Sequence, residues 1–194
     1  MPTLLVVIAS TRPGRVGLPV GQWFIQFAQQ HGTFSVNTAD LLKLDLPLMN
    51  EPNHPRFRNY TLSHTKEWSR VVDAADAVVF VMPEYNYSMT APLKNALDYL
   101  YVEWQYKPVG LLSYGGISGG LRAAQMLKQV VTTLKMMPIP EGISIPFVRE
   151  FIKDGVFQPN ELMVQSAQMM LDELARWEEA LRPLRYAVRQ NSTT

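Results

Sequence analysis

The sequence has 194 residues, of which 47% are hydrophobic and 18% charged, so it is long enough to bury a core and too apolar for a disordered or fibrous protein. Eighteen Lys and Arg against 17 Asp and Glu leave a net charge of +1, which provides no overall field to attract a nucleic acid or an anionic membrane. The absence of cysteine excludes disulfides, thiolate metal sites and cysteine nucleophiles, and three scattered histidines do not suggest a metal site.

The beginning of the chain predicts neither export nor membrane insertion. The apolar run Leu4–Ala9 is too short for a signal-peptide core, and no positively charged residue precedes it. No window approaches the roughly 18 apolar residues that a membrane span requires. We therefore expect a cytoplasmic protein.

Hydrophobic periodicity predicts alternating strands and helices. The apolar runs expected to form strands are, in chain order, Thr3–Ala9, Phe34–Leu41, Ala77–Met82, Pro108–Tyr114 and Ile139–Pro146. Apolar residues at helical spacing predict five helices, whose stripes begin at Val20, Thr65, Leu93, Ala123 and Ala167. Residues 47–59 hold three prolines and predict a long loop, and residues 190–194 are expected to fray.

This order of elements predicts an α/β fold. Five apolar strands alternating with helices are typical of a doubly wound parallel sheet with helices on both faces, here a single domain over residues 1–194. In such a sheet, ligands bind outside the carboxyl ends of the strands. The turns after the first, third and fourth strands are therefore the candidate site.

The first turn predicts a phosphate site. Hydroxyls, guanidinium groups and glycines precede a helix N-terminus, where unpaired N–H groups favour an anion, and no acidic residue occurs before Asp40. The alternative is a polar cap whose arginines face water. Neither a dinucleotide-binding glycine motif nor a P-loop is present, so a mononucleotide remains. The turn consists of Ser10, Thr11, Arg12, Pro13, Gly14, Arg15, Val16 and Gly17.

The second turn, residues 83–88, predicts contacts with a planar heterocycle. Its backbone N–H groups suit the polar edge of such a ring, while Tyr85 or Tyr87 covers a face. The alternative is an Asn-containing turn whose tyrosines pack against a neighbouring helix. Glu84 invites a general-acid role, for which one carboxylate without a partner is weak evidence.

The third turn, residues 113–120, contains the G-x-S-x-G pattern of a serine hydrolase around Ser118. The catalytic histidine of that fold follows the serine in the chain, and no histidine lies beyond His64. The hydrolase interpretation is therefore rejected. The glycines instead favour close approach of the backbone to a flat ligand and donation of N–H bonds to an oxygen or a developing negative charge.

These motifs resemble those of the NAD(P)H-dependent FMN reductases of flavodoxin-like fold, a family that includes quinone, azo-dye and chromate reductases. The resemblance runs from Thr3 to about Arg149. It rests on Ser10-x-Arg12 with Arg15, on the P-E-Y-N-Y-S turn that begins at Pro83 and the following L-K-N-A-L-D, and on G-G-x-S-G-G from Gly115. It implies a parallel sheet of strand order 2-1-3-4-5.

The resemblance also implies a site. The FMN phosphate would be held by Ser10, Arg12, Arg15 and the backbone of Val16, Gly17 and Leu18. The isoalloxazine would be lined by Pro83, Glu84, Tyr85 and Asn86, and its far side would be bordered by Ser113, Gly115, Gly116 and Ser118. No catalytic side chain and no metal are expected, because flavin N5 accepts the hydride from NADPH or NADH.

The family is usually dimeric or tetrameric, which implies a homodimer or homotetramer here. Four aromatic residues crowd the end of the third helix and the next loop, and one helical stripe cannot bury them all. They predict an interface between copies or, alternatively, a core beneath the loop at residues 47–59. They are Tyr99, Tyr101, Trp104 and Tyr106.

The resulting expectation is an FMN-dependent oxidoreductase that uses NAD(P)H to reduce a quinone or similar small acceptor. Three alternatives stay open: a flavin reductase that releases FMNH₂ to a monooxygenase, a flavodoxin-like electron carrier, and a regulatory flavin sensor. The net charge of +1 argues against the carrier, because such carriers resemble strongly acidic proteins. Arg122 and Arg149 are the candidates for contacts with a nicotinamide-cofactor ribose phosphate.

Overall fold

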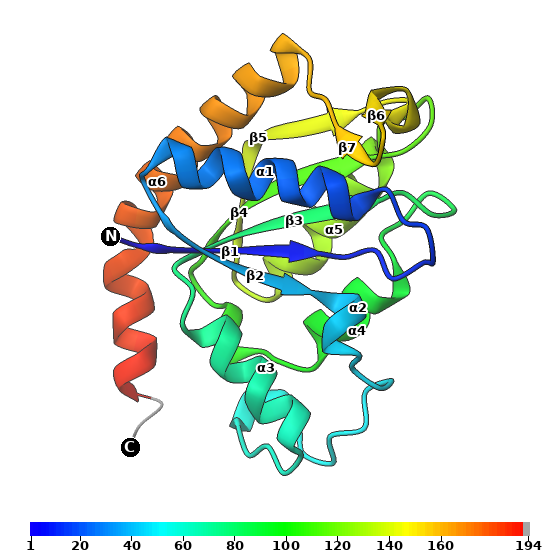
Figure 1. Ribbon diagram of the computed structural model, residues 1–194. Helices are drawn as coiled ribbons and strands as arrows, with labels where there is room; N and C mark the ends of the chain where they lie inside the picture. Colours follow the sequence, from blue (N-terminus) through cyan, green and yellow to red (C-terminus); the bar gives the residue numbers. More distant parts are fainter. Residues whose placement is uncertain (192–194) are drawn as a thin grey trace.

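The computed structural model describes residues 1–191, with side chains up to Val188. Five parallel strands form one sheet in the order β2-β1-β3-β4-β5, as the resemblance implied (Figure 1). The strands are β1 (Thr3–Ile8), β2 (Ser35–Asp40), β3 (Ala77–Pro83), β4 (Pro108–Tyr114) and β5 (Met137–Ile145). The predicted doubly wound, flavodoxin-like fold is confirmed.

Helices cover both faces of the sheet, with α1 and α6 on one face and α3, α4 and α5 on the other (Figure 1). The α-helices are α1 (Gly17–His31), α2 (Leu41–Leu44), α3 (Ser63–Asp73), α4 (Ala91–Asp98), α5 (Leu121–Thr133) and α6 (Glu161–Asn191). Shorter 3-10 turns are η1 (Pro55–Phe57), η2 (Val102–Trp104) and η3 (Val148–Phe151).

The strand sequences explain this layering. Successive side chains of a strand point to opposite faces, so a strand covered on both faces is apolar throughout. In β1, Leu4 and Val6 pack with α1 and α6, whereas Leu5 and Val7 pack with α3, α4 and α5. All seven residues of β3 are buried, which places this strand at the centre of the core.

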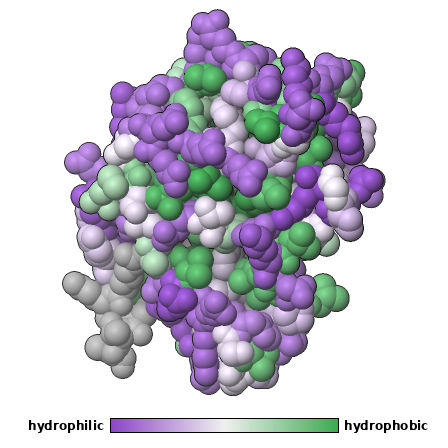
Figure 2. All heavy atoms as spheres, viewed as in Figure 1, coloured by the Kyte–Doolittle hydropathy of each residue, from purple (hydrophilic) through white to green (hydrophobic). Residues whose placement is uncertain are grey.

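The edge strands differ from the central ones. β2 is polar and largely exposed because it has a neighbour on one side only. β5 tolerates Pro138 and Pro140 for the same reason, and its pairing with β4 shifts register between Val109 and Leu111. Figure 2 shows hydrophilic residues over most of the visible face, with hydrophobic residues gathered in patches across its middle.

The structure adds two short elements to the sequence prediction and changes the start of the last helix. Helix α2 and a hairpin of β6 (Ile152–Lys153) and β7 (Val156–Phe157) were not predicted, because such short elements carry no periodicity. Helix α6 begins at Glu161, where Asn160 accepts a hydrogen bond from the Met163 N–H (2.9 Å). The frayed tail expected at residues 190–194 stays a prediction: α6 extends to Asn191, and residues 192–194 lie outside the described part of the chain.

The loop at residues 47–59 is held against the helices on one face of the sheet. The Tyr99 hydroxyl donates to Asn50 Oδ1 (2.9 Å), and Glu51 accepts hydrogen bonds from the Thr61 and Leu62 N–H groups. Tyr99 and Trp104 are fully buried within this packing. For these two aromatic residues the structure therefore matches the intramolecular alternative, not the predicted interface between copies.

Replacement of Phe24 tests the packing of α1 on the sheet. Phe24 is fully buried between α1, α6 and the sheet, so Phe24→Ala should lower the free energy of unfolding by about 3–5 kcal/mol. Phe57→Ala is the matched control, because its side chain is 69% exposed and its loss should change stability by less than about 0.5 kcal/mol. Urea denaturation measures both, and equal losses would contradict this packing.

Glu51 predicts a pH-dependent contribution to stability. Burial opposes its ionisation, but hydrogen bonds from Thr61 and Leu62 outweigh burial and lower the pKa of Glu51. A lowered folded pKa means that the stabilisation is complete above the unfolded value of about 4.3 and is lost as the pH falls through the folded pKa. The stability difference between wild type and Glu51→Gln should therefore be largest at neutral pH and shrink in urea denaturation below pH 4. A pH-independent difference would contradict this account.

Candidate active site

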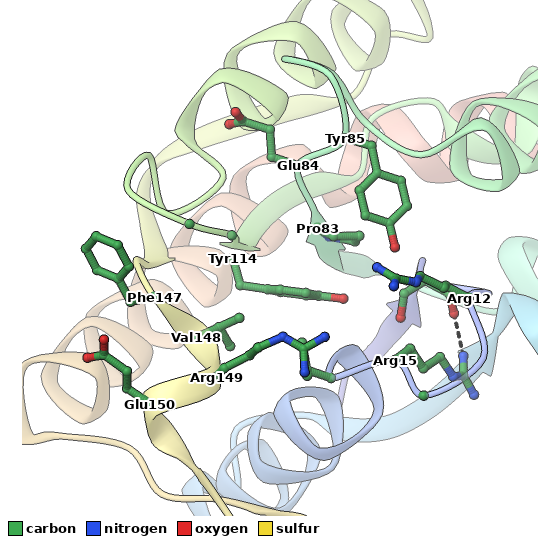
Figure 3. A pocket seen from close by; sticks show the side chains of 15 residues that line it. Arg12, Arg15, Pro83, Glu84, Tyr85, Tyr114, Phe147, Val148, Arg149 and Glu150 are labelled. Carbon is green, nitrogen blue, oxygen red and sulfur yellow. Dashed lines mark hydrogen bonds between the residues drawn. The ribbon is translucent and has the colours of Figure 1, made fainter.

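A pocket of about 350 Å³ lies at the carboxyl ends of β1, β3 and β4 (Figure 3). Nine of the predicted site residues line it: Ser10, Arg12, Arg15, Val16, Pro83, Glu84, Tyr85, Gly115 and Gly116. The lining does not include five others: Gly17, Leu18, Asn86, Ser113 and Ser118. The structure thus brings the three predicted turns together around one hollow.

The first turn ends in an uncapped helix N-terminus. Val16 occupies the N-cap position of α1, and its side chain makes no capping hydrogen bond. The first helical turn carries no acidic residue. Among the described residues, no acceptor is recorded for the N–H groups of Val16, Gly17 and Leu18. Unpaired N–H groups and the helix dipole make this end of α1 favourable for an anion.

Two buried hydroxyls face this helix end without partners. Ser10 Oγ and the Tyr114 hydroxyl have no hydrogen-bond partner of normal geometry within the described residues. A Cβ on Gly17 would lie 2.3 Å from Ser10 Oγ and 2.1 Å from the Tyr114 oxygen, so only glycine fits there. Buried hydroxyls are normally paired, and these two therefore suit a ligand rich in acceptor oxygens. Burial raises the pKa of Tyr114, so its phenol remains a proton donor.

Arg15 is already paired. Its guanidinium makes two hydrogen bonds of 2.5 Å to the Asp40 carboxylate, at the carboxyl end of β2, and another of 2.5 Å to the Ser10 carbonyl oxygen. Burial opposes ionisation of Asp40, but the hydrogen bonds and charge of Arg15 outweigh it and lower the pKa of Asp40. Arg15 therefore braces the first turn, whereas Arg12 has no carboxylate partner recorded among the described residues.

The second turn is tight. Tyr85 and Ser88 exchange backbone hydrogen bonds of 3.0 Å, and Asn86 and Tyr87 between them adopt left-handed φ values of 49° and 70°. Asparagine tolerates this conformation better than most residues, which explains its place at the tip. The turn directs Tyr85 into the pocket and leaves Asn86 exposed outside it.

Glu84 points away from the pocket interior and ties the second turn to the third (Figure 3). Its carboxylate accepts hydrogen bonds from the Ser118 hydroxyl (2.9 Å) and from Arg122 Nε (2.6 Å), and the Arg122 guanidinium lies 3.9 Å from the centre of the Tyr87 ring. Burial opposes ionisation of Glu84, but these contacts outweigh it and lower its pKa. Glu84 is therefore ionised near neutral pH, which argues against the general-acid role.

The third turn brings backbone to the pocket wall. The N–H groups of Gly115 and Gly119 are used internally, donating to the carbonyl oxygens of Ile145 (3.2 Å) and Gly116 (3.1 Å). Within the described residues, no acceptor is recorded for the N–H groups of residues 116–118. The Ser113 hydroxyl holds the turn by donating to the Gly119 carbonyl oxygen (3.0 Å).

On one wall of the pocket, the sequence indicated Arg149 alone, as a candidate for contact with a nicotinamide ribose phosphate. The segment after β5 lines it with Phe147, Val148, Arg149 and Glu150, and Tyr114 and Gly14 complete the lining. Phe147 and Val148 donate backbone hydrogen bonds to Gly116 (3.1 Å) and Gly115 (3.2 Å). The sequence did show that this segment follows a strand, where ligands bind in this fold class. That the segment folds back against the turn after β4 is visible only in the tertiary structure.

Other kinds of site receive no support. In the described part of the chain, no group of three or more potential metal-ligating side chains is close enough to hold an ion. Likewise, no helix over residues 1–191 is long and apolar enough to cross a membrane. The hydroxyl of Ser118, at the centre of the hydrolase-like pattern, is bonded to Glu84 and not to a histidine.

Comparison with known proteins gives a consistent answer. The family described as NADPH-dependent FMN reductase matches residues 2–149. An NAD(P)H-dependent FMN reductase of Schizosaccharomyces pombe is 38% identical over 160 residues, covering 81% of this chain and 80% of that protein. A second, from Nectria sp., is 30% identical and covers 95% and 94% of the two chains.

Other similarities agree. An NADPH azoreductase of Bacillus sp. is 37% identical over 124 residues, covering 63% of this chain and 66% of that protein. Among solved structures, the flavoenzyme NAD(P)H:(acceptor) oxidoreductase of Paracoccus denitrificans has a TM-score of 0.73 at 22% identity, covering 93% and 98% of the two chains. The last similarity supports the fold. The resemblance seen in the motifs is thus confirmed, and the chain belongs to the NADPH-dependent FMN reductase family of flavodoxin-like enzymes.

Proposed function

We propose that this enzyme binds FMN in the pocket at the carboxyl ends of β1, β3 and β4. In this proposal it uses NADPH or NADH to reduce a quinone, an azo compound or a similar small acceptor. The observation that carries the proposal is the pair of buried hydroxyls on Ser10 and Tyr114, which lie beside the uncapped start of α1 and have no hydrogen-bond partner of normal geometry within the described residues. They fit a phosphate monoester, whose oxygens accept from hydroxyl and backbone N–H groups together.

The chain would bind the two ends of the cofactor by different means. At the phosphate end, Ser10, Tyr114 and the N–H groups of Val16, Gly17 and Leu18 are neutral donors. At the ring end, Pro83, Tyr85, Gly115 and Gly116 offer a largely apolar wall with exposed backbone. A mononucleotide flavin with a flat, partly apolar ring suits this division of the pocket.

The bound flavin would supply the hydride chemistry, accepting a hydride from the nicotinamide and passing electrons to the acceptor. The protein's part is to orient the ring and to stabilise negative charge at its polar edge. Among the N–H groups of residues 116–118, for which no acceptor is found within the described residues, that of the pocket-lining Gly116 suits the second task. The Glu84–Arg122 ion pair positions these groups by holding the second and third turns in a fixed relation.

This assignment gives several predicted residues an indirect role. Glu84 and Ser118 fix the turns that form the pocket, and Arg122, a candidate for ribose-phosphate binding, is held by Glu84 and Tyr87. Arg149 is the candidate that lines the pocket. The flavin-reductase alternative, with release of FMNH₂, uses the same site and differs in how tightly the flavin is retained.

Assembly and location belong to the same proposal. We propose a single domain over residues 1–194 that acts in the cytoplasm as a homodimer or homotetramer. Large exposed apolar side chains support self-association, among them Leu48 and Ile117, which are 82% and 80% exposed. Light scattering at micromolar concentration tests it, and a monomer would contradict it.

The first prediction concerns cofactor and activity. Purified protein titrated with FMN should quench flavin fluorescence and then oxidise NADPH or NADH in the presence of a small quinone. Anaerobic titration with each nicotinamide, followed by flavin absorbance, measures the donor preference. Protein that neither binds FMN nor oxidises either donor would refute the proposed function, whereas saturation kinetics in free FMN would favour the flavin-reductase alternative.

The second prediction separates binding from folding. Tyr114→Phe removes a buried hydroxyl that has no partner of normal geometry within the described residues, so the free energy of unfolding of the apoprotein should stay the same or rise slightly. The dissociation constant for FMN should increase about tenfold, because a donor to the phosphate is lost. Chemical denaturation and fluorescence titration measure the two quantities. Unchanged FMN affinity would remove Tyr114 from the site.

A further inference from the structure

The phosphate end of the pocket lacks one of the cations that the sequence predicted. Arg15 is bound by both oxygens of Asp40 and by the Ser10 carbonyl oxygen, all at 2.5 Å. Breaking this bidentate pair to serve a phosphate would leave the Asp40 carboxylate, whose side chain is 8% exposed, without its partner. Arg15 therefore stabilises the turn and is not available as a counter-charge.

A different arginine faces the same space. Arg149 lies on η3 and lines the pocket on the wall opposite the first turn. Figure 3 shows its side chain reaching along the pocket toward the Tyr114 hydroxyl, with Arg12 on the other side of that hydroxyl and Arg15 turned away. No carboxylate partner is recorded for Arg12 or Arg149 within the described residues.

The segment that carries Arg149 is firmly held. Its backbone donates hydrogen bonds to the carbonyl oxygens of Gly115 and Gly116. The hairpin that follows packs on α1, where the ring centroids of Phe157 and Trp23 lie 5.1 Å apart. These contacts fix the wall with respect to both the third turn and α1. The Arg149 backbone is thereby pre-organised to present its side chain to a ligand.

The charge balance of the pocket favours the same conclusion. The other charged lining residues are Arg15 and Glu84, which are neutralised by Asp40 and Arg122, and Glu150, which points away from the phosphate end in Figure 3. The guanidinium groups of Arg12 and Arg149 remain, and neither has a carboxylate partner in the part of the chain that the structure describes. A phosphate monoester carries a charge of about −1.5 to −2 at neutral pH, which two guanidinium groups match.

We propose that Arg149, together with Arg12, supplies the counter-charge for the FMN phosphate in place of Arg15. This inference rests on the proposed function, since it names which cations serve the flavin site. It places a residue from beyond β5 at a subsite otherwise built from the turn after β1, the start of α1 and Tyr114 of β4. It also assigns Arg149 to the flavin phosphate and not to a ribose phosphate of the nicotinamide cofactor.

The test compares FMN with riboflavin, which has the same ring and ribityl chain but no phosphate. Fluorescence titrations of both flavins should be made with the wild type, Arg149→Gln and Arg149→Lys at two salt concentrations. Arg149→Gln should weaken FMN binding about tenfold and leave riboflavin binding unchanged, with a smaller dependence of FMN affinity on salt. Arg149→Lys keeps the charge and should recover part of the loss.

The control is Arg176→Gln, which removes an arginine whose side chain is 79% exposed on α6 and should change neither titration. If Arg149→Gln binds FMN as the wild type does but shows a raised KM for NADPH, the assignment to the flavin phosphate is overturned. Equal weakening of both flavins would also overturn it, because that result indicates general damage to the pocket. A wild type that binds neither flavin would refute the proposed function itself.

Discussion

The site depends above all on the register of three parallel strands. Ile8 of β1 pairs with Val81 of β3, which pairs with Leu112 of β4. The carboxyl ends of these three strands therefore lie side by side at one edge of the sheet. Backbone hydrogen bonds extend this alignment into the turns. The Ala9 N–H donates to the Val81 carbonyl oxygen (2.9 Å), and the Glu84 N–H donates to the Tyr114 carbonyl oxygen (3.1 Å). The three short turns after these strands thereby form one continuous wall of the pocket.

Charged side chains around this wall mostly stabilise each other. The Arg15–Asp40 pair ties the first turn to β2, and the Glu84–Arg122 pair ties the second turn to the third. Each pair fixes backbone that faces the pocket, and neither leaves a free charge there. The donors that face the pocket are then mainly neutral, from the hydroxyls of Ser10 and Tyr114 and from backbone N–H groups, and no ionic partner holds them.

Much of this organisation could be predicted from local patterns. Continuous apolar runs identified the central strands because a strand covered on both faces has no polar position, and glycine and proline marked the turns. The short elements, α2 and the β6–β7 hairpin, were missed because two to four residues carry no period. The direction of the Glu84 side chain was missed as well, because its partners Ser118 and Arg122 lie more than thirty residues away in the chain.

The sequence by itself determined the fold class, the strand runs and the three turns that line the pocket, because these follow from periodicity and from the chemistry of adjacent residues. Only the tertiary structure decided which side chains are free to bind. Arg12 and Arg15 are three residues apart, yet Asp40 engages one of them alone. Arg149 joins the pocket only because the chain after β5 folds back onto Gly115 and Gly116. Ion pairs and backbone contacts between segments far apart in the chain depend on three-dimensional proximity, and a sequence pattern does not contain this information.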